Sequence, residues 1–344
     1  MSELVSLTPK VWDERLLESG RPFRFSHRAE GVGALASTFS PHPPHLLEVR
    51  FQDGARFLIP TVKQVRAMEA LSIHVALPLD WEGMPIPLDG ELQAAHLHGL
   101  LQALGGGGLR VHGGGRNSPP STGTVRTHTT HILDLTPGFQ ELWASRFSGK
   151  NRNSCRKAEK SGVTVERRVG PEAFQAYVHL YRNTQVTRQE GDGYPDALFS
   201  ALAPSPFTEV WFAQQGGEVV AGAVFLQGSE DVFYWSGAMD REHQGAAPSN
   251  AVLKAAIHHF SEAGVRYLDM GASEGLPGVR RFKESFGAEP AEVRSVEITT
   301  RLNRGLSRVA GLREWVRGRL RRGPRQVEMS ADGAFEGASE GTPG

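Results

Sequence analysis

Alternating apolar and polar residues in the first part of the chain predict several short strands separated by turn residues. An apolar pattern with helical spacing follows over residues 89–104 and stops at the glycines 105–108, which predicts a helix with an abrupt end. The strands are predicted at residues 46–51, 56–62, 73–77, 109–112 and 130–135. The first part is therefore predicted to be a mixed α/β unit.

The second part repeats the same kinds of element. Three consecutive strands are joined by short Gly-containing segments, Gly216-Gly217 and residues 228–231, which favours antiparallel pairing. Helices are predicted at 171–183, 249–263 and 279–285, and strands at 208–213, 219–226, 232–238, 267–270 and 293–299. We predict an α/β (α+β) fold of two domains, 1–135 and 136–300, each with a mixed, mainly antiparallel sheet covered by helices.

Composition limits the class of protein. The chain has 344 residues, 39% of them hydrophobic and 22% charged, and its formal net charge is zero. Any attraction for a polyanion must therefore come from local patches. The single cysteine, Cys155, allows no internal disulfide, and neither a transmembrane run nor a signal-peptide core is present in the sequence. These features predict a cytoplasmic protein, with peripheral association at the inner face of the membrane as an open alternative.

A concentrated positive charge follows the first part. The segment 150–165, KNRNSCRKAEKSGVTV, together with Arg146, carries six cations. A helix would align Arg152, Arg156 and Lys160 on one stripe, which predicts contact with phosphate or RNA. A solvated helix face is the alternative interpretation.

A second basic segment lies near the C-terminus. Residues 301–325 contain nine arginines and one acid, Glu314, with apolar residues along one side of a predicted helix. Such a helix can pack on its own domain, contact anionic lipid or bind RNA. Residues 326–344 are acidic and rich in Gly and Ser, which predicts a disordered tail.

Four segments in order resemble the Fem-type (FemAB/FemX-like) aminoacyl transferases of the GNAT superfamily. The resemblance extends over about residues 130–290 and rests on residues 130–165, 180–191, 219–273 and 275–290. It implies two GNAT-like domains packed together and an acyltransferase that forms an amide bond. Enzymes of this family transfer an amino acid from aminoacyl-tRNA to an amine of a peptidoglycan precursor, either lipid II or its soluble nucleotide precursor.

The resemblance also implies site residues. Lys283, within Arg281-Phe282-Lys283, is predicted to hold a phosphate or the developing oxyanion, with Arg281 beside it. The carboxylates of Asp269 and Glu274 are the predicted proton acceptors. The remaining predicted substrate-binding residues are Arg152, Arg156, Thr184, Arg188, Tyr234 and Trp235. Because Tyr234 and Trp235 alternate on one strand, only one of them is expected to line the cleft.

No metal ion or bound cofactor is predicted, and the donor is the open question. A CoA-dependent GNAT protein grips the pyrophosphate with glycine amides at a helix N-terminus. Here the loop is Gln244-Gly-Ala-Ala-Pro248-Ser249, in which alanine and serine replace the expected glycines and Pro248 has no amide hydrogen. This loop favours aminoacyl-tRNA as the donor. Two alternatives stay open: an acetyl-CoA-dependent N-acyltransferase for an amino sugar or small metabolite in cell-envelope polysaccharide assembly, and an inactive GNAT scaffold that binds RNA.

Overall fold

The computed structural model describes residues 2–64, 72–77, 81–114, 118–188, 193–273 and 276–300, with backbone only for 185–188. Residues 1–300 form one compact unit. The predicted basic helix at 301–325 and the predicted tail at 326–344 lie outside the described residues. No helix among the described residues is both long and apolar enough to span a bilayer.

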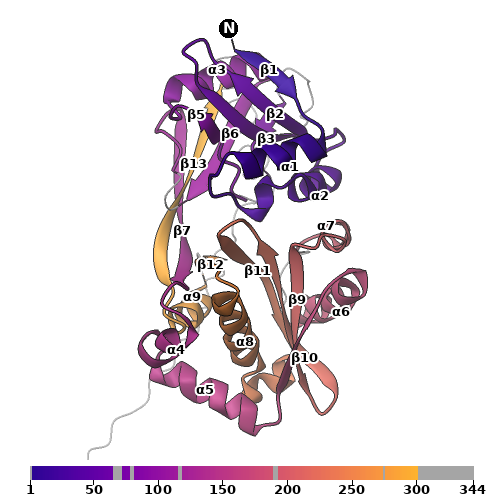
Figure 1. Cartoon of the computed structure of the whole chain (residues 1–344). Coiled ribbons are helices and arrows are strands. Elements are labelled where there is room, and N and C mark those ends of the chain that lie inside the picture. The colour runs from indigo at the N-terminus through magenta and orange to yellow at the C-terminus, as the bar shows by residue number, and fades with distance from the viewer. Residues whose placement is uncertain are drawn as a thin grey trace, which may run out of the picture. The chain divides into compact units, whose positions relative to one another are not determined.

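The elements of the first half begin with a strand and two helices (Figure 1). They are β1 (Glu3–Ser6), α1 (Pro9–Glu18), a 3₁₀ turn (Phe25–His27), α2 (Ala29–Phe39), β2 (His45–Arg50), β3 (Arg56–Gln64), β4 (Ile73–Val75), β5 (Ile86–Asp89), α3 (Ala94–Leu104), β6 (Gly108–Gly114) and β7 (Thr124–Asp134).

The second half begins with three consecutive helical segments. They are α4 (Phe139–Glu141), a π turn (Leu142–Arg146) and α5 (Gly149–Lys160). The chain continues through β8 (Thr164–Arg168), α6 (Pro171–Arg188), α7 (Asp196–Leu202), β9 (Thr208–Gln215), β10 (Glu218–Gln227), β11 (Asp231–Met239), a 3₁₀ turn (Arg241–Ala246), α8 (Pro248–Glu262), β12 (Tyr267–Ala272), α9 (Pro277–Glu284) and β13 (Glu289–Thr299).

Apart from the additional strand β5 in the first half, the first half and the second half from β8 onward share one order of elements: a strand, two helices, three strands, a helix and further strands, with α9 before the last strand of the second half. In each half the third of those three strands pairs in parallel with the strand after the helix, β4 with β6 and β11 with β12, while the other pairs are antiparallel. The predicted mixed α/β class, with mainly antiparallel pairing, is confirmed. The predicted boundary at residue 135 stays a prediction.

One continuous sheet joins the halves. Its order is β1-β2-β3-β4-β6-β13-β7-β12-β11-β10-β9-β8, with β5 paired to β3. The last strand, β13, lies between β6 and β7, so the C-terminal end of the described chain completes the sheet of the first half (Figure 1).

Packing also crosses between the halves. One apolar cluster combines Trp12 and Leu35 of the first half with Tyr177, Phe199 and Trp235 of the second. The other two clusters lie mainly in one half each: one surrounds α8 and includes Leu133 of β7, and the other surrounds α3 and includes Val296 and Ile298 of β13. The shared cluster means that neither half buries all of its apolar surface alone.

The predicted helix at 89–104 is wrong in its first part. Residues 86–89 pair with β3 as strand β5, and the helix begins at Ala94 after Gln93, whose backbone is extended. The alternating segment Ile86-Pro87-Leu88-Asp89 has strand periodicity, and Pro87 favours an extended chain before it. Helices α1 and α2 were not predicted, although Thr8 caps α1 and Pro9 occupies its first turn.

Gly123 enters the central β7–β13 pair with a positive φ of 65°, and a Cβ there would lie 2.4 Å from the Glu297 carbonyl oxygen. We expect Gly123→Ala to lower the free energy of unfolding by about 3 kcal/mol, because left-handed strain adds to a steric clash with the backbone. Gly20→Ala is the matched control, since Gly20 has a φ of 59° and open space around it. It should cost only about 1 kcal/mol. Urea unfolding of both variants measures the difference, and equal losses would contradict the packing at Gly123.

Candidate active site

A cavity of about 990 Å³ opens where two strands separate. Strands β11 and β12 pair in parallel only over Asp231–Phe233 and Tyr267–Asp269, and β11 then continues to Met239 paired with β10 but no longer with β12. The gap is bordered by α9 and by the N-terminus of α8, and residues of the first half also line the cavity. The site is therefore assembled from both halves of the chain.

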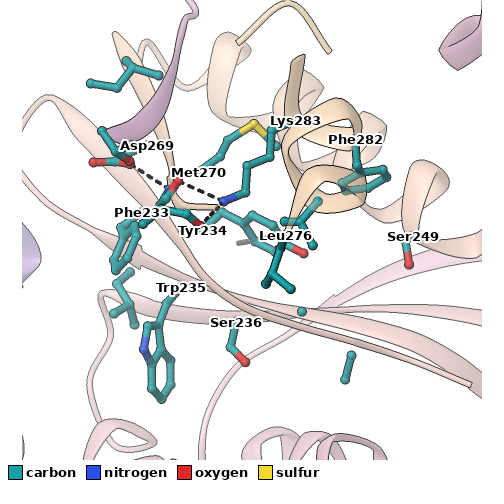
Figure 2. A pocket seen from close by; sticks show the side chains of 18 of the residues that line it. Phe233, Tyr234, Trp235, Ser236, Ser249, Asp269, Met270, Leu276, Phe282 and Lys283 are labelled. Carbon is teal, nitrogen blue, oxygen red and sulfur yellow. Dashed lines mark hydrogen bonds between the residues drawn. The ribbon is translucent and has the colours of Figure 1, made fainter. Parts of the chain in front are cut away.

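Lys283 reaches this cavity from α9. Its side chain is only 3% exposed, and its Nζ donates to the carbonyl oxygens of Gly271 at 2.9 Å and Ala272 at 2.7 Å (Figure 2). Those carbonyls follow an irregularity in the β12–β7 register, and Gly271 has a φ of 73°. The bulge turns the backbone of β12 toward the ammonium group, which is thereby held at the cavity wall.

Asp269 lies at the end of the paired part of β12 and is held by three donors. Its Oδ1 accepts from Thr130 Oγ1 at 2.6 Å and from the Gly271 amide at 2.9 Å, while Oδ2 is 3.3 Å from Arg24 Nη2. The same backbone turn thus connects Asp269 with Lys283.

Arg24 connects three carboxylates from both halves. Its guanidinium lies 3.0 Å from Glu82, 2.5 Å from Asp231 and 3.3 Å from Asp269. Burial lowers the pKa of Arg24, but the charges of Asp231, Glu82 and Asp269 outweigh burial, and its pKa lies well above the ordinary value. The guanidinium is therefore a permanent cation in this cluster.

For two carboxylates of the cluster, Glu82 and Asp231, burial outweighs the charge of Arg24, so that the neutral, protonated form is favoured. Burial raises the pKa of Glu82 to about 7, with the charges of Asp231 and Asp269 adding to burial and Arg24 partly opposing it. Burial likewise raises the pKa of Asp231, again opposed by Arg24. Glu82 lines the cavity, whereas Asp231 is not among the residues that line it.

An aromatic wall faces the charged residues. Trp81 meets the rings of Phe233 and Trp235 edge to face at centroid distances of 6.3 and 5.7 Å, and Tyr194 lies 4.9 Å from Trp235. The cavity is therefore lined by both charged and aromatic side chains, which is the usual composition of a small-molecule site.

Tyr234 and Trp235 both line the cavity, so the expectation that only one of them would do so is wrong. The two side chains do alternate: Tyr234 packs with the cluster around α8, and Trp235 packs with the cluster shared by the halves (Figure 2). Both reach the cavity because the separation of β11 from β12 exposes both faces of the sheet.

The cavity brings together only some of the predicted site residues. Lys283, Asp269, Tyr234 and Trp235 line it. Glu274 and the side chain of Arg188 lie outside the described residues.

Two other predicted residues, Arg152 and Arg156, contact the protein itself and do not line the cavity. Arg152 donates to the carbonyl oxygens at the end of the preceding π turn, those of Trp143, Ala144 and Phe147. Arg156 lies over the Trp143 ring, with its guanidinium carbon 5.6 Å from the ring centroid.

Thr184 is buried and bonds the backbone of Leu180 and Met239. Arg281 is exposed on α9 and is not among the lining residues. Neither side chain therefore joins Lys283 at the cavity wall.

The cationic helix α5 nevertheless borders the cavity, through Ser154. The exposed cations nearest to Ser154 on the helix surface are Lys150, four residues before it, and Lys157, three residues after it. Neither lysine forms an ion pair with a described residue. The face that meets the cavity is thus a different one from the predicted stripe.

The loop before α8 also lines the cavity, through Gln244 and Ala247. The amide of Ala247 donates to Gln244 O, and at the start of α8 the amides of Asn250 and Ala251 both donate to Ala247 O. Pro248 has no amide hydrogen, and Ala247 adopts a φ of 55° without being glycine. These four positions therefore offer no free amide to a pyrophosphate.

Cys155 is buried between α5 and α8, and burial raises the pKa of its thiol to about 11. A thiol that is protonated at neutral pH is a poor nucleophile. Among the described residues, no cluster of three or more His, Cys, Asp or Glu side chains is arranged to hold a metal ion.

Sequence reasoning missed Arg24 and Glu82. They lie 207 and 149 residues before Asp231, in a part of the chain that carries no motif of the resemblance. The position of Arg24 between Phe23 and Phe25 was the available signal in the sequence.

We expect Arg24→Met to lower the free energy of unfolding by about 3–5 kcal/mol near pH 8, because three buried carboxylates lose their shared cation. Without that cation the raised pKa values of Glu82 and Asp231 rise further, so the loss should shrink at pH 5, where these two carboxylates can take up protons. Denaturant unfolding at both pH values measures this. Arg15→Met, which removes an exposed pair with Glu18, should cost less than about 0.5 kcal/mol at either pH.

Residues 145–284 match the sequence profile of a family described as an acetyltransferase (GNAT) domain. No curated protein sequence matches the chain.

Solved structures match over most of the chain. The crystal structure of FemX matches with a TM-score of 0.63 at 12% identity, over 89% of this chain and 99% of that one. A conserved protein of unknown function from Bacteroides thetaiotaomicron gives a TM-score of 0.56 at 13% identity, over 86% and 99% of the two chains. L-PGS from Bacillus licheniformis gives 0.50 at 13% identity, over 85% and 92%. At such identities the likeness shows a common fold.

Proposed function

We propose that this chain, an acyltransferase with a GNAT domain and the Fem-type fold, transfers an amino acid from aminoacyl-tRNA to an amine of a peptidoglycan precursor. The observation that supports this donor is the segment at the start of α8, where Pro248 has no amide hydrogen and the amides of Ala247, Asn250 and Ala251 already donate to backbone carbonyl oxygens. These amides are not available to a CoA pyrophosphate, which favours a donor that is held by other contacts.

Positive charge beside the cavity suits a tRNA donor. Lys150 and Lys157 are exposed on the face of α5 that borders the cavity at Ser154. Phosphates of a tRNA end can lie along this face while the terminal aminoacyl ester enters the cavity. A donor of this kind implies a cytoplasmic enzyme, and a lipid-linked acceptor would bring it to the inner face of the membrane.

The reaction joins the acceptor nitrogen to the ester carbonyl carbon and breaks the bond from that carbon to the ribose oxygen. The amine loses a proton, and the ribose oxygen gains one. Negative charge develops on the carbonyl oxygen in between, and the ammonium of Lys283 is a fixed, buried cation at the cavity wall that can stabilise it. Its two carbonyl partners hold the ammonium in place before the substrate arrives.

Two other readings have specific support. The matched family description favours an acetyl-CoA donor, with an amino sugar or small metabolite as the acceptor. The likeness to L-PGS favours a lipid acceptor, because a further structural match is named as a putative lysylphosphatidylglycerol synthetase. An inactive RNA-binding scaffold is the non-enzymatic alternative.

Measurements of donor binding distinguish these proposed functions. We expect charged tRNA to bind with an affinity that falls steeply as salt rises, and acetyl-CoA to bind weakly or not at all. Calorimetric titration at two salt concentrations measures both. Tight acetyl-CoA binding with weak tRNA binding would replace the proposed donor, and tRNA binding without any transfer would favour the scaffold.

Transfer itself tests the role of Lys283. With labelled aminoacyl-tRNA, and with lipid II, its soluble precursor and phosphatidylglycerol vesicles as acceptors, we expect transfer to the peptidoglycan precursors. Lys283→Met should lower kcat/KM by about 100- to 1000-fold, because the oxyanion loses its cation. Lys283→Arg, which keeps the charge, should lose less, and Lys10→Ala, at an exposed position on α1, should behave as wild type. Full activity in Lys283→Met would remove Lys283 from the mechanism.

A further inference from the structure

We propose that Glu82, contributed by the first half of the chain, accepts the proton of the attacking amine. The inference rests on the proposed function, and it assigns the role predicted for Asp269 and Glu274 to a residue about 190 positions earlier in the chain.

Hydrogen bonding distinguishes the two carboxylates at the cavity wall. Asp269 uses both oxygens, with Thr130 and Gly271 on Oδ1 and Arg24 at Oδ2. A proton on Asp269 would displace one of these donors. Glu82 receives one bond, from Arg24 Nε to Oε2 at 3.0 Å, and no described residue donates to Oε1. Glu82 therefore has an oxygen available for a ligand in the cavity.

The position of Glu82 is fixed without using that oxygen. Its backbone carbonyl accepts from Ser26 Oγ at 2.5 Å, and its Oε2 is anchored by Arg24. The side chain is 13% exposed and contributes to the cavity lining. A base held on one oxygen and open on the other is preorganised for proton transfer.

Opposing charges surround Glu82. Arg24 favours its charged form, and the carboxylates of Asp231 and Asp269 favour its protonated form. Behind Arg24, His27 is buried, which lowers its pKa to about 4 and leaves it neutral near pH 7. The other titratable groups at the cavity wall are His128, Tyr181, Tyr194, Tyr234 and Lys283.

Glu82 can both take up and return the proton that the reaction moves. The neutral amine forms its bond to the carbonyl carbon and passes a proton to Glu82, while Lys283 faces the negative carbonyl oxygen. When the carbon–oxygen bond to ribose breaks, Glu82 returns that proton to the leaving oxygen. Glu82 ends as the carboxylate with which it began, so no further co-reactant is needed.

The pH dependence follows from the electrostatics. Because burial and two neighbouring carboxylates raise the pKa of Glu82 to about 7, the base form is lost as pH falls through that value. We expect kcat/KM of the wild type to decline below about pH 7 with an acidic limb of unit slope. A general base in this position contributes about 100-fold or more to the rate.

The test compares pH profiles of Glu82→Gln and Asp231→Asn in the full-length chain, with labelled aminoacyl-tRNA and the soluble peptidoglycan precursor. Glu82→Gln should lose about 100-fold in kcat/KM at pH 8 and lack the limb near pH 7. Asp231→Asn removes a carboxylate of the same cluster that does not line the cavity. It should keep the limb but move it to lower pH, because one of the charges that raise the pKa of Glu82 is gone.

Several outcomes would overturn the proposal. A Glu82→Gln variant with wild-type rate, or one that is slower at every pH but keeps an unshifted limb, would show a structural role only. If Glu82→Gln does not fold, Glu82→Asp supplies the comparison, since its shorter carboxylate should keep the limb at a reduced rate. An inactive wild type would overturn both the proposed function and the role of Glu82, whereas an active wild type with an unaffected Glu82→Gln would overturn the role alone.

Titration of Glu82 can also be followed without any substrate. The raised pKa means that the protonated form stabilises the fold below about pH 4.5, its ordinary value, and that this stabilisation is lost as pH rises toward 7. Glutamine mimics the protonated form at every pH. The Tm of Glu82→Gln relative to wild type should therefore rise between these pH values, and a constant difference would show that Glu82 does not titrate there.

Discussion

The buried guanidinium of Arg24 is the contact on which the arrangement of the cavity depends. It lies just before the 3₁₀ turn of the first half, yet two of its three carboxylate partners, Asp231 and Asp269, belong to the second half. Those two residues mark the beginning of β11 and the end of the paired stretch of β12. One side chain thus spans the short paired stretch, from its beginning on β11 to its end on β12. Burial raises the pKa of Glu82, and because three carboxylates share a single cation, the charges of Asp231 and Asp269 raise it as well.

The separation of β11 from β12 has a simple geometric origin. A parallel pair needs a connection that crosses over the sheet, and here α8 provides it. The pair lasts only three residues on each strand, after which β12 bulges at Gly271 and β11 continues beside β10 only. The same bulge presents two carbonyls to Lys283 and an amide to Asp269. The irregularity that ends the pairing is therefore also what positions the two charged groups.

Local pattern was enough to predict most strands of the second half, because β9, β10 and β11 alternate cleanly and are joined by short Gly-containing turns. Lys283 and Asp269 were found because they stand in the segments that carry the Fem-type resemblance. Arg152 and Thr184 do not line the cavity, for a physical reason: a cation or hydroxyl on a helix can bond backbone carbonyls just as well as a ligand, and periodicity does not distinguish the two. Arg24 and Glu82 were out of reach because their partners are brought near only by the packing of one half on the other.

The packing of the halves explains what the first half contributes. The matched family covers only residues 145–284, which lie in the second half. The first half has its own parallel pair, β4 with β6, but the cavity at β11 and β12 draws Arg24, Phe25, Ser26, Trp81 and Glu82 from it. In return, β13 of the second half completes the sheet of the first, between β6 and β7. Each half thus lacks something that only the other supplies: the first half lacks a strand, and the second lacks the cation that balances Asp231 and Asp269. A second half expressed alone would leave these two acids without their shared cation at the cavity wall, so the site and the fold require the same contact between the halves.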